Sequence, residues 1–231
     1  LSLIPGNVGT TPVQNVGAYG VETKDVCTEV RFVERGTGAV HTFSAADCAF
    51  GYRDSVFKGP WRNRAVITAV RFHLTKRNHT LKTHYGSVDA ELEAAGIQPS
   101  PQSISDAVVR IRRSKLPDPA ELGNSGSFFK NPTVSAEEYA RLRALKSDAP
   151  GYPQADGRVK LAAGWLIEQA GWKGYRRGDA GVHAKQALVL VNYGRATGPE
   201  IWQLAQDVVA DVHAKFGVSL EPEVNLVGGG L

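Results

Sequence analysis

The spacing of apolar residues changes at the stretch "LPDP", residues 116–119, and this change constrains the fold more than any other feature. Upstream, segments 26–43 and 65–74 alternate apolar and polar residues, which predicts a β-hairpin and a further strand. Downstream, helical spacing dominates, with one short buried strand expected over 186–192. The sequence therefore predicts an α+β chain with a domain boundary near Leu116–Asp118.

Helix start and stop residues bound the expected helices. Spacing of three and four residues predicts helices over 103–115, 135–147, 159–171 and 197–216. The last is the clearest, because Thr197 is a good N-cap, Pro199 suits the first turn and Gly217 ends the pattern. Capping boxes are expected at Ser103 with Asp106 and at Ser135 with Glu138. Segment 218–228 is expected to be extended and to lie at a sheet edge, because Pro222 cannot donate to a ladder.

Composition narrows the classes of protein. The chain has 231 residues, of which 42% are hydrophobic and 22% charged, as in globular proteins with a buried core. A net charge of +4 allows nucleic-acid binding, but the basic residues are scattered, and a solvated face or a small phosphorylated ligand explains "RIRRSK" at 110–115 better. No apolar run reaches the ~20 residues of a membrane span. We therefore expect neither nucleic acid nor a membrane as partner.

The chain's beginning and its cysteines carry two further expectations. It contains no methionine and opens on Leu1 in a turn-rich segment, so we expect a fragment or a processed form. Cys27 and Cys48 have neither metal spacing nor the density of a disulfide scaffold, and the six histidines show no metal spacing. A reduced, cytoplasmic setting without a metal site is expected.

The stretch "LGNSGSFFKNP", residues 122–132, places Ser127 on a pliable backbone beside two phenylalanines. Serines flanked by glycine are mostly ordinary turn residues. The Gly-x-Ser-x-Gly elbow of hydrolases is absent because residue 129 is Phe, which disfavours a hydrolytic nucleophile.

Two other polar positions allow a functional and a plain explanation. Arg53 stands among aromatic residues, where it can bind a carboxylate or a flavin carbonyl, or form a surface salt bridge with Asp54. Glu221 and Glu223 share one side of an expected strand, where one carboxyl can be kept protonated, but an exposed edge strand explains them equally well.

In their order, seven blocks of sequence resemble one family. They are "LIPGNVGTTPVQNVGAYGVE", "FGYRDSVFK", "SKLPDP", "GNSGSFFKNP", "YPQADGRVKLAAGWLIEQAGWKG", "HAKQALVLVN" and "LEPEV". Together they resemble UDP-N-acetylenolpyruvoylglucosamine reductase, also called UDP-N-acetylmuramate dehydrogenase, over nearly the whole chain. A different oxidase of the same flavin superfamily is expected to lack the fourth and seventh blocks together.

The resemblance implies a fold and a reaction. Residues 1–116 are expected to be the latter part of an FAD-binding domain of the vanillyl-alcohol-oxidase (FAD-binding PCMH) type, 117–218 an α+β substrate-binding domain, and 219–231 a strand that returns to the flavin domain. In that family NADPH reduces FAD, and the flavin then reduces the enolpyruvyl group of UDP-N-acetylglucosamine enolpyruvate, which completes UDP-N-acetylmuramate for peptidoglycan. The family is usually monomeric. The alternative is an inactive fragment that only binds the UDP-sugar through its C-terminal domain.

The resemblance also implies roles for single residues. Ser127 matches the family's proton donor, while Arg53 and Glu223 match the pair that polarises the substrate carboxylate. The expected substrate contacts are Tyr85, Lys115, Asn131, Tyr152, Lys160 and Gln186. The expected FAD contacts are Val13, Gly17, Ala18 and Arg112. Tyr85 lies in a loop like the one that closes over substrate in the family's longer subclass, and Asn225 stands where relatives carry arginine.

Overall fold

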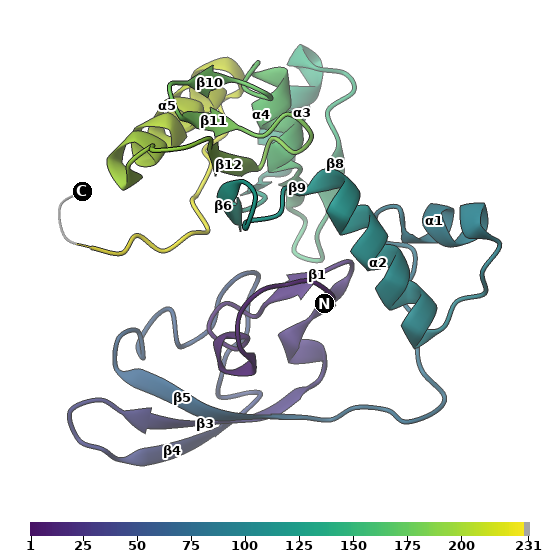
Figure 1. The fold of residues 1–231 in the computed structure, drawn as a ribbon, viewed down its shortest axis with the longest axis vertical. Helices are drawn as coiled ribbons and strands as arrows, with labels where there is room; N and C mark the ends of the chain where they lie inside the picture. Colours follow the sequence, from purple (N-terminus) through teal and green to yellow (C-terminus); the bar gives the residue numbers. More distant parts are fainter. Residues whose placement is uncertain (229–231) are drawn as a thin grey trace. The chain divides into compact units, whose positions relative to one another are not determined.

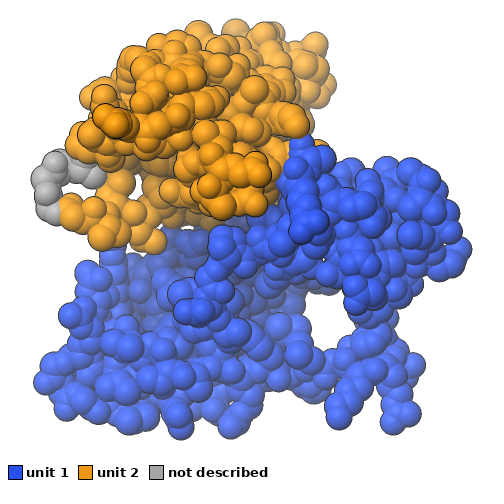
Figure 2. Space-filling model, in the orientation of Figure 1, with its two compact units in different colours: residues 1–114 blue, residues 115–231 orange. Residues whose placement is uncertain are grey.

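The structure is a computed structural model that describes residues 1–228. It divides the chain into two compact units. Residues Leu1–Ser114 form the first unit and Lys115–Leu231 the second (Figure 2). Both combine helices with antiparallel sheet (Figure 1), so the α+β expectation is confirmed.

The first unit is built on a three-stranded antiparallel sheet of order β4-β3-β5. Its elements are η1 (Val8–Thr10), β1 (Gly17–Ala18), β2 (Val21–Glu22), η2 (Thr23–Asp25), β3 (Cys27–Glu34), β4 (Val40–Ser44), β5 (Ala65–Phe72), α1 (Val88–Ala95) and α2 (Pro101–Lys115), whose last residue falls in the second unit. The predicted hairpin and the strand over 65–74 are confirmed. Phe32 is fully buried at the centre of this sheet, where it contacts Phe43, Phe57 and Trp61 edge to face.

Helix α2 confirms its predicted apolar face but not its predicted start. Ala107, Val108 and Ile111 are buried against α1. The helix begins at Pro101, and the hydroxyls of Ser100 and Ser103 each accept the backbone N–H of the other. The predicted capping box of Ser103 with Asp106 is therefore wrong, because Ser103 exchanges its capping hydrogen bonds with Ser100, one turn earlier.

Helix α1 was not predicted. Its buried residues are Val88 and Leu92, and Gly96 ends it in the left-handed conformation with φ 64°. Two buried side chains make a weak periodic pattern, so a helix of this length depends on packing against α2 rather than on its own sequence.

The second unit contains two antiparallel sheets, of order β10-β11-β12-β6 and β7-β9-β8. Its elements are β6 (Gly123–Ser127), β7 (Thr133–Val134), α3 (Ala136–Leu145), β8 (Gly151–Pro153), β9 (Val159–Leu161), α4 (Ala163–Gln169), β10 (Arg176–Arg177), β11 (Ala180–Val182), β12 (Val189–Asn192) and α5 (Gly198–Phe216). One hydrophobic core joins α3, α4 and α5 to β11 and β12. Leu204, Val208 and Val212 of α5 are fully buried in it, as their spacing predicts.

The helix predicted over 159–171 is wrong in its first part. Residues Val159–Leu161 form β9, which pairs with β7 on one side and β8 on the other. Val159 and Leu161 are buried and Lys160 is half-buried, so the period here is two, and the helix begins only after Ala162. The capping boxes of Ser135 with Glu138 and of Thr197 with Glu200 are both present. The strand expected over 186–192 is confirmed from Val189 onward.

Between Gly217 and Gly228 the segment after α5 forms no strand, bends at Val224 and makes an isolated bridge between Pro222 and Phe129. Residues 229–231 of the expected terminal strand lie outside the described part of the chain. The return of this segment to a flavin domain stays a prediction.

Candidate functional site

Ser127 is the last residue of β6 and follows Gly126, whose backbone conformation only glycine adopts easily. Gly126, just before it, has φ +74°, and a Cβ built there would meet nothing within 4 Å. The glycine is therefore required for its conformation and not for space. The register between β6 and β12 shifts between Val189 and Val191, so this part of the strand is bulged.

The side chain of Ser127 is exposed, whereas those of Phe128 and Phe129 are buried, with ring centroids 5.2 Å apart. The phenylalanines anchor the backbone in the core. Within residues 1–228 the Ser127 hydroxyl has no hydrogen-bond partner. The Ser127 hydroxyl is thus exposed to solvent, while the two buried phenylalanines that follow it fix its backbone.

Glu223 lies on the segment that pairs with the continuation of β6. Its N–H donates to the carbonyl of Phe128 at 2.8 Å, and the N–H of Lys130 donates to the carbonyl of Glu221 at 2.9 Å. These two bonds flank the bridge between Phe129 and Pro222. Pro222 therefore occupies a position where no N–H is needed, and the pairing places Glu223 opposite Phe128, the residue after Ser127.

The two glutamates have different surroundings. The Glu221 carboxylate is 70% exposed and forms an ion pair with Lys130. Glu223 is only half-buried and sits one residue beyond the bridge. The lysine neutralises Glu221, so the structure separates two residues that the sequence treats alike.

Arg53 belongs to the first unit and has a strained backbone. Its φ is 55°, in the left-handed region that residues other than glycine seldom adopt. Its guanidinium donates to the carbonyl of Gly17 at 2.7 Å and lies 5.1 Å from the centre of the Tyr52 ring. Strain of this kind persists only where surrounding contacts enforce it, and it concentrates at functional sites.

The turn that carries Val13, Gly17 and Ala18 is held by other polar residues. The Ser55 hydroxyl donates to the carbonyl of Val13 at 2.7 Å. Gly17 pairs with Glu22, and a Cβ on Gly17 would lie 2.7 Å from the Glu22 side chain and 2.9 Å from the Val21 carbonyl oxygen. No other residue type fits at position 17.

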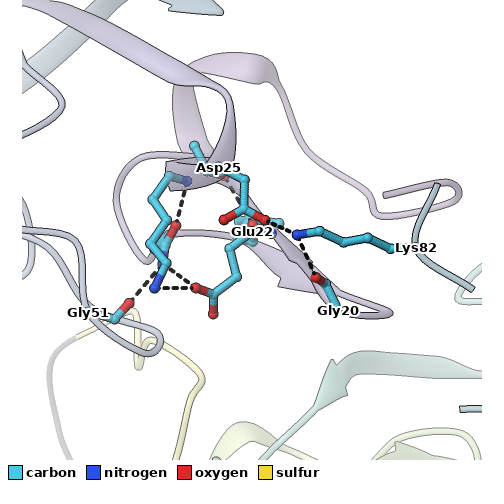
Figure 3. A network of polar contacts seen from close by, with 9 residues as sticks. Gly20, Glu22, Asp25, Gly51 and Lys82 are labelled. Atoms are coloured by element: carbon cyan, nitrogen blue, oxygen red, sulfur yellow. Dashed lines mark hydrogen bonds and ion pairs between the residues drawn. The ribbon is translucent and has the colours of Figure 1, made fainter. Parts of the chain in front are cut away.

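Asn15 organises this turn, although its side chain is not singled out by the sequence. It is fully buried, donates to the Gly51 carbonyl at 2.9 Å and to the Glu22 carboxylate at 3.1 Å, and accepts the N–H of Lys24 at 2.9 Å. Figure 3 shows this network around Glu22 and Gly51. An asparagine inside a glycine-rich turn was the only available hint, since asparagine tolerates the positive φ of 46° found here.

Arg112 reaches from α2 to the first residues of the chain. Its Nη2 donates to the carbonyl of Leu3 at 3.3 Å, while its buried Nε has no partner among the described residues. Burial raises the pKa of the nearby Tyr19, an effect that Arg112 opposes and Tyr85 reinforces. A buried guanidinium N–H without a partner suits an anionic ligand.

Four of the expected substrate contacts lie in the second unit. Cross-strand pairing places Tyr152 directly beside Lys160, and the next partner of Lys160 is Thr133, two residues after Asn131. The Asn131 side-chain oxygen accepts the N–H of Ala163 at 2.9 Å, at the start of α4.

Gln186 reaches the same end of α4. Its side-chain oxygen lies close to Gly164, where an added Cβ would be 3.2 Å away, and it accepts the N–H of Leu188 at 3.3 Å. The side chains of Asn131 and Gln186, from two separate segments, thus meet at the beginning of this helix.

The remaining expected contacts lie elsewhere. Lys115 is the last residue of α2 and is exposed. Tyr85 is 58% exposed, in the loop between β5 and α1.

A cavity of about 530 Å³ opens on the second unit between β6, β12, the start of α5 and the final segment. Phe128, Trp202 and Asn225 line it, but Ser127 and Glu223 do not. The cavity therefore coincides neither with the pairing of the Ser127 and Glu223 segments nor with Asn131 and Gln186 at the start of α4.

Neither a metal centre nor a membrane span emerges from the described part of the chain. Residues 1–228 contain no group of three or more His, Cys, Asp or Glu side chains that can hold a metal ion. None of the helices in this range is long and apolar enough to cross a bilayer.

These features define an α+β protein with an arginine-bearing glycine turn in one unit and a serine–glutamate strand pair in the other. The family described as UDP-N-acetylenolpyruvoylglucosamine reductase, C-terminal domain, matches residues 118–227. Reductases of that name from Pseudomonas putida, Chromobacterium violaceum and Flavobacterium johnsoniae are 58%, 59% and 51% identical over 98%, 96% and 98% of this chain. The chain belongs to the UDP-N-acetylenolpyruvoylglucosamine reductase family.

The match covers only part of these relatives. The chain spans 66%, 66% and 68% of their respective lengths. A crystal structure of the Thermus caldophilus reductase has a TM-score of 0.61 and 23% identity, and covers 96% of this chain and 61% of that one. At this identity the likeness concerns the fold alone.

Proposed function

We propose that this chain carries the substrate-reducing residues of an FAD- and NADPH-dependent reductase that converts UDP-N-acetylglucosamine enolpyruvate to UDP-N-acetylmuramate. The names of the relatives support the reaction. The observation that carries the proposal is the pairing of the Ser127 and Glu223 segments, which places an exposed, unpartnered hydroxyl beside a glutamate-bearing strand.

FAD suits the first unit, which we assign to the vanillyl-alcohol-oxidase type. Gly17 accepts no side chain because the Glu22 side chain and the Val21 carbonyl fill that space, which fixes the turn. The Nε of Arg112 is a buried donor without a partner among residues 1–228, which suits an anionic group of the cofactor. Val13, Gly17, Ala18 and Arg112 would hold the cofactor. Bound there and reduced by NADPH, the cofactor would supply the hydride.

Three side chains of this protein then stabilise the developing negative charge and donate a proton. Arg53 and Glu223 polarise the substrate carboxylate while negative charge develops beside it. Ser127 donates a proton to the neighbouring carbon, and its small side chain and the glycine before it let the hydroxyl come within reach. Phe128 and Phe129 are buried in the core and fix the position of the strand that carries Ser127.

The nucleotide-sugar is bound by residues suited to a diphosphate. Lysine ammonium groups, amides and phenols all donate hydrogen bonds to phosphate oxygens. We assign this role to Tyr85, Lys115, Asn131, Tyr152, Lys160 and Gln186. We further propose that the protein acts as a cytoplasmic monomer in peptidoglycan precursor synthesis, without nucleic acid as a partner.

A second candidate function is favoured because four of these residues lie in the second unit: Tyr152 pairs with Lys160, and Asn131 and Gln186 both lie at the start of α4. A protein that binds the UDP-sugar through this unit alone, without turnover, would use the same contacts.

The test is an absorbance spectrum of the purified full-length polypeptide followed by a turnover assay. The proposal expects oxidised-flavin bands and NADPH oxidation that depends on the enolpyruvyl substrate. Glu223→Gln should abolish turnover, whereas the matched variant Glu221→Gln should retain it because Glu221 is paired with Lys130. A colourless protein that binds the UDP-sugar would support the second candidate, and equal losses in both variants would contradict the role of Glu223.

A further inference from the structure

One lysine ties the Tyr85 loop to the glycine turn of the first unit. The Nζ of Lys82 donates to the Asp25 carboxylate at 3.0 Å and to the Gly20 carbonyl at 3.2 Å. Figure 3 shows Lys82 reaching both oxygens from a segment far along the chain. We call this pair of contacts the Lys82 latch.

Tyr85 packs on the same turn that the latch holds. A Cβ built on Gly20, which has φ +76°, would lie 3.3 Å from the Cβ of Tyr85. A Cβ on Gly86 would in turn meet the ring of Tyr19 at 3.8 Å. The β1–β2 turn and the Tyr85 loop therefore lie in direct contact, three residues from the latch.

The other end of the loop is fixed to α1. Thr83 is buried, and the His84 Nδ1 lies 2.8 Å from the Asp89 carboxylate. With Lys82 on one side and Asp89 on the other, Tyr85 is held between two anchors while most of its ring remains exposed.

Asp25 is suited to hold a lysine. Burial opposes its ionisation, but the Lys82 side chain and the N–H of Glu22 outweigh this and hold the pKa of Asp25 below its usual value. The ammonium and the carboxylate are 47% and 33% exposed. Ion pairs at such exposure contribute little to folding stability, so the consequence of this pair lies in where it places the loop.

We propose that Lys82 is a positioning residue that sets the affinity for the nucleoside-diphosphate sugar by holding Tyr85 over the β1–β2 turn. This rests on the proposed role of Tyr85 as a substrate contact. Lys82 acts through Tyr85 and does not itself touch the substrate.

The experiment compares Lys82→Ala, Lys82→Arg and a matched control, Lys76→Ala, in the full-length polypeptide. Lys76 is exposed in the same loop and has no hydrogen bond or ion pair within residues 1–228. Backbone amide exchange over 80–86 is measured first, since it requires no activity. Lys82→Ala should speed exchange there by about tenfold, the size typical of coupled neighbours, and the control should not.

Steady-state kinetics supply the second readout. Lys82→Ala should raise the KM for the UDP-sugar by about tenfold with little change in kcat, and Lys82→Arg should restore it. In a Tyr85→Ala background the loss of Lys82 should add nothing. Unchanged exchange in Lys82→Ala, or a full additional KM effect without Tyr85, would overturn the proposal. A wild-type protein without turnover would contradict the proposed function, while the exchange result would still decide the latch.

Discussion

Gly126 is the residue whose replacement most sharply tests why Ser127 stands where it does. Its φ of +74° costs an L-residue about 1–2 kcal/mol, because Cβ approaches the following carbonyl oxygen. Alanine also restricts the unfolded chain, which returns about 0.4–1 kcal/mol. Since a Cβ would meet nothing within 4 Å, no steric cost is added. Gly126→Ala should therefore lower the free energy of unfolding by about 1 kcal/mol.

Two further variants separate conformation from bulk. Gly126→Asn should cost less than Gly126→Ala, because asparagine tolerates the left-handed region. Gly123→Ala, in the same strand, is the matched control. Gly123 has no positive φ, and its added Cβ would contact the Asn192 Cβ at an ordinary 3.5 Å. This variant should be neutral or slightly stabilising.

Urea unfolding followed by tryptophan fluorescence measures the difference, since Trp165, Trp172 and Trp202 all lie in the second unit. Trp202 reports on the strand itself, because its ring lies 6.5 Å from that of Phe128. If Gly126→Ala were as stable as Gly123→Ala, or if asparagine cost more than alanine, the conformational explanation of Gly126 would be refuted.

Three other predictions concern binding and the thiols. Asn131→Ala should lose both substrate affinity and about 1 kcal/mol of stability, whereas Asn131→Asp keeps the oxygen that caps Ala163 and should lose affinity alone; equal unfolding midpoints for the two variants would contradict this. Lys115→Ala should lower the affinity for NADPH and for the UDP-sugar alike, by about tenfold to a hundredfold for a lost contact of ~1.5–3 kcal/mol. Titrations that show unchanged affinities would mean that Lys115 is not part of the site. Burial, aided by Cys27 and Asp47, raises the pKa of the Cys48 thiol from 9.0 to about 12, so folding is favoured fully below pH 9 and that contribution is lost as the pH rises toward 12. Alkylation at pH 8 should be about 10³-fold slower in the folded than in the denatured protein, and comparable rates would contradict this burial.

Helix boundaries were predictable where a glutamate marks the first turn. The capping box of Ser135 with Glu138 and the N-cap of Thr197 are local signatures, and both form as expected; the structure adds that Thr197 makes its capping box with Glu200. The start of α2 was missed because Ser100 and Ser103 cap each other, a pairing that sequence rules do not include.

The boundary between β9 and α4 was missed for a different reason. The run from Val159 to Ile167 is apolar enough to fit either period, and only pairing with β7 and β8 makes its first three residues a strand. Long-range pairing of this kind leaves no local trace in the sequence.

For the candidate site, the residue types and their order in the sequence were sufficient to predict which residues take part, but not how these residues lie relative to one another. Pro222 predicted an edge, and the structure adds that its bridge to Phe129 aligns the Ser127 and Glu223 segments. The sequence could not separate Glu221 from Glu223 by spacing, because the ion pair of Glu221 with Lys130 joins segments far apart in the chain. Lys82 and Asn15 escaped notice because their partners lie on other segments.

Rapid-mixing measurement of the two half-reactions in Ser127→Ala tests the proposed chemistry most directly. The side chain is exposed and has no hydrogen-bond partner within residues 1–228, so folding stability should change by less than about 0.5 kcal/mol. Reduction of the bound flavin by NADPH should proceed at nearly the wild-type rate. Reoxidation by UDP-N-acetylglucosamine enolpyruvate should slow by about 10²–10⁴-fold, the usual worth of a general acid, or by more if the carbanion partitions poorly without its donor. If both half-reactions slowed equally, or if reoxidation were unaffected, Ser127 would not be the proton donor.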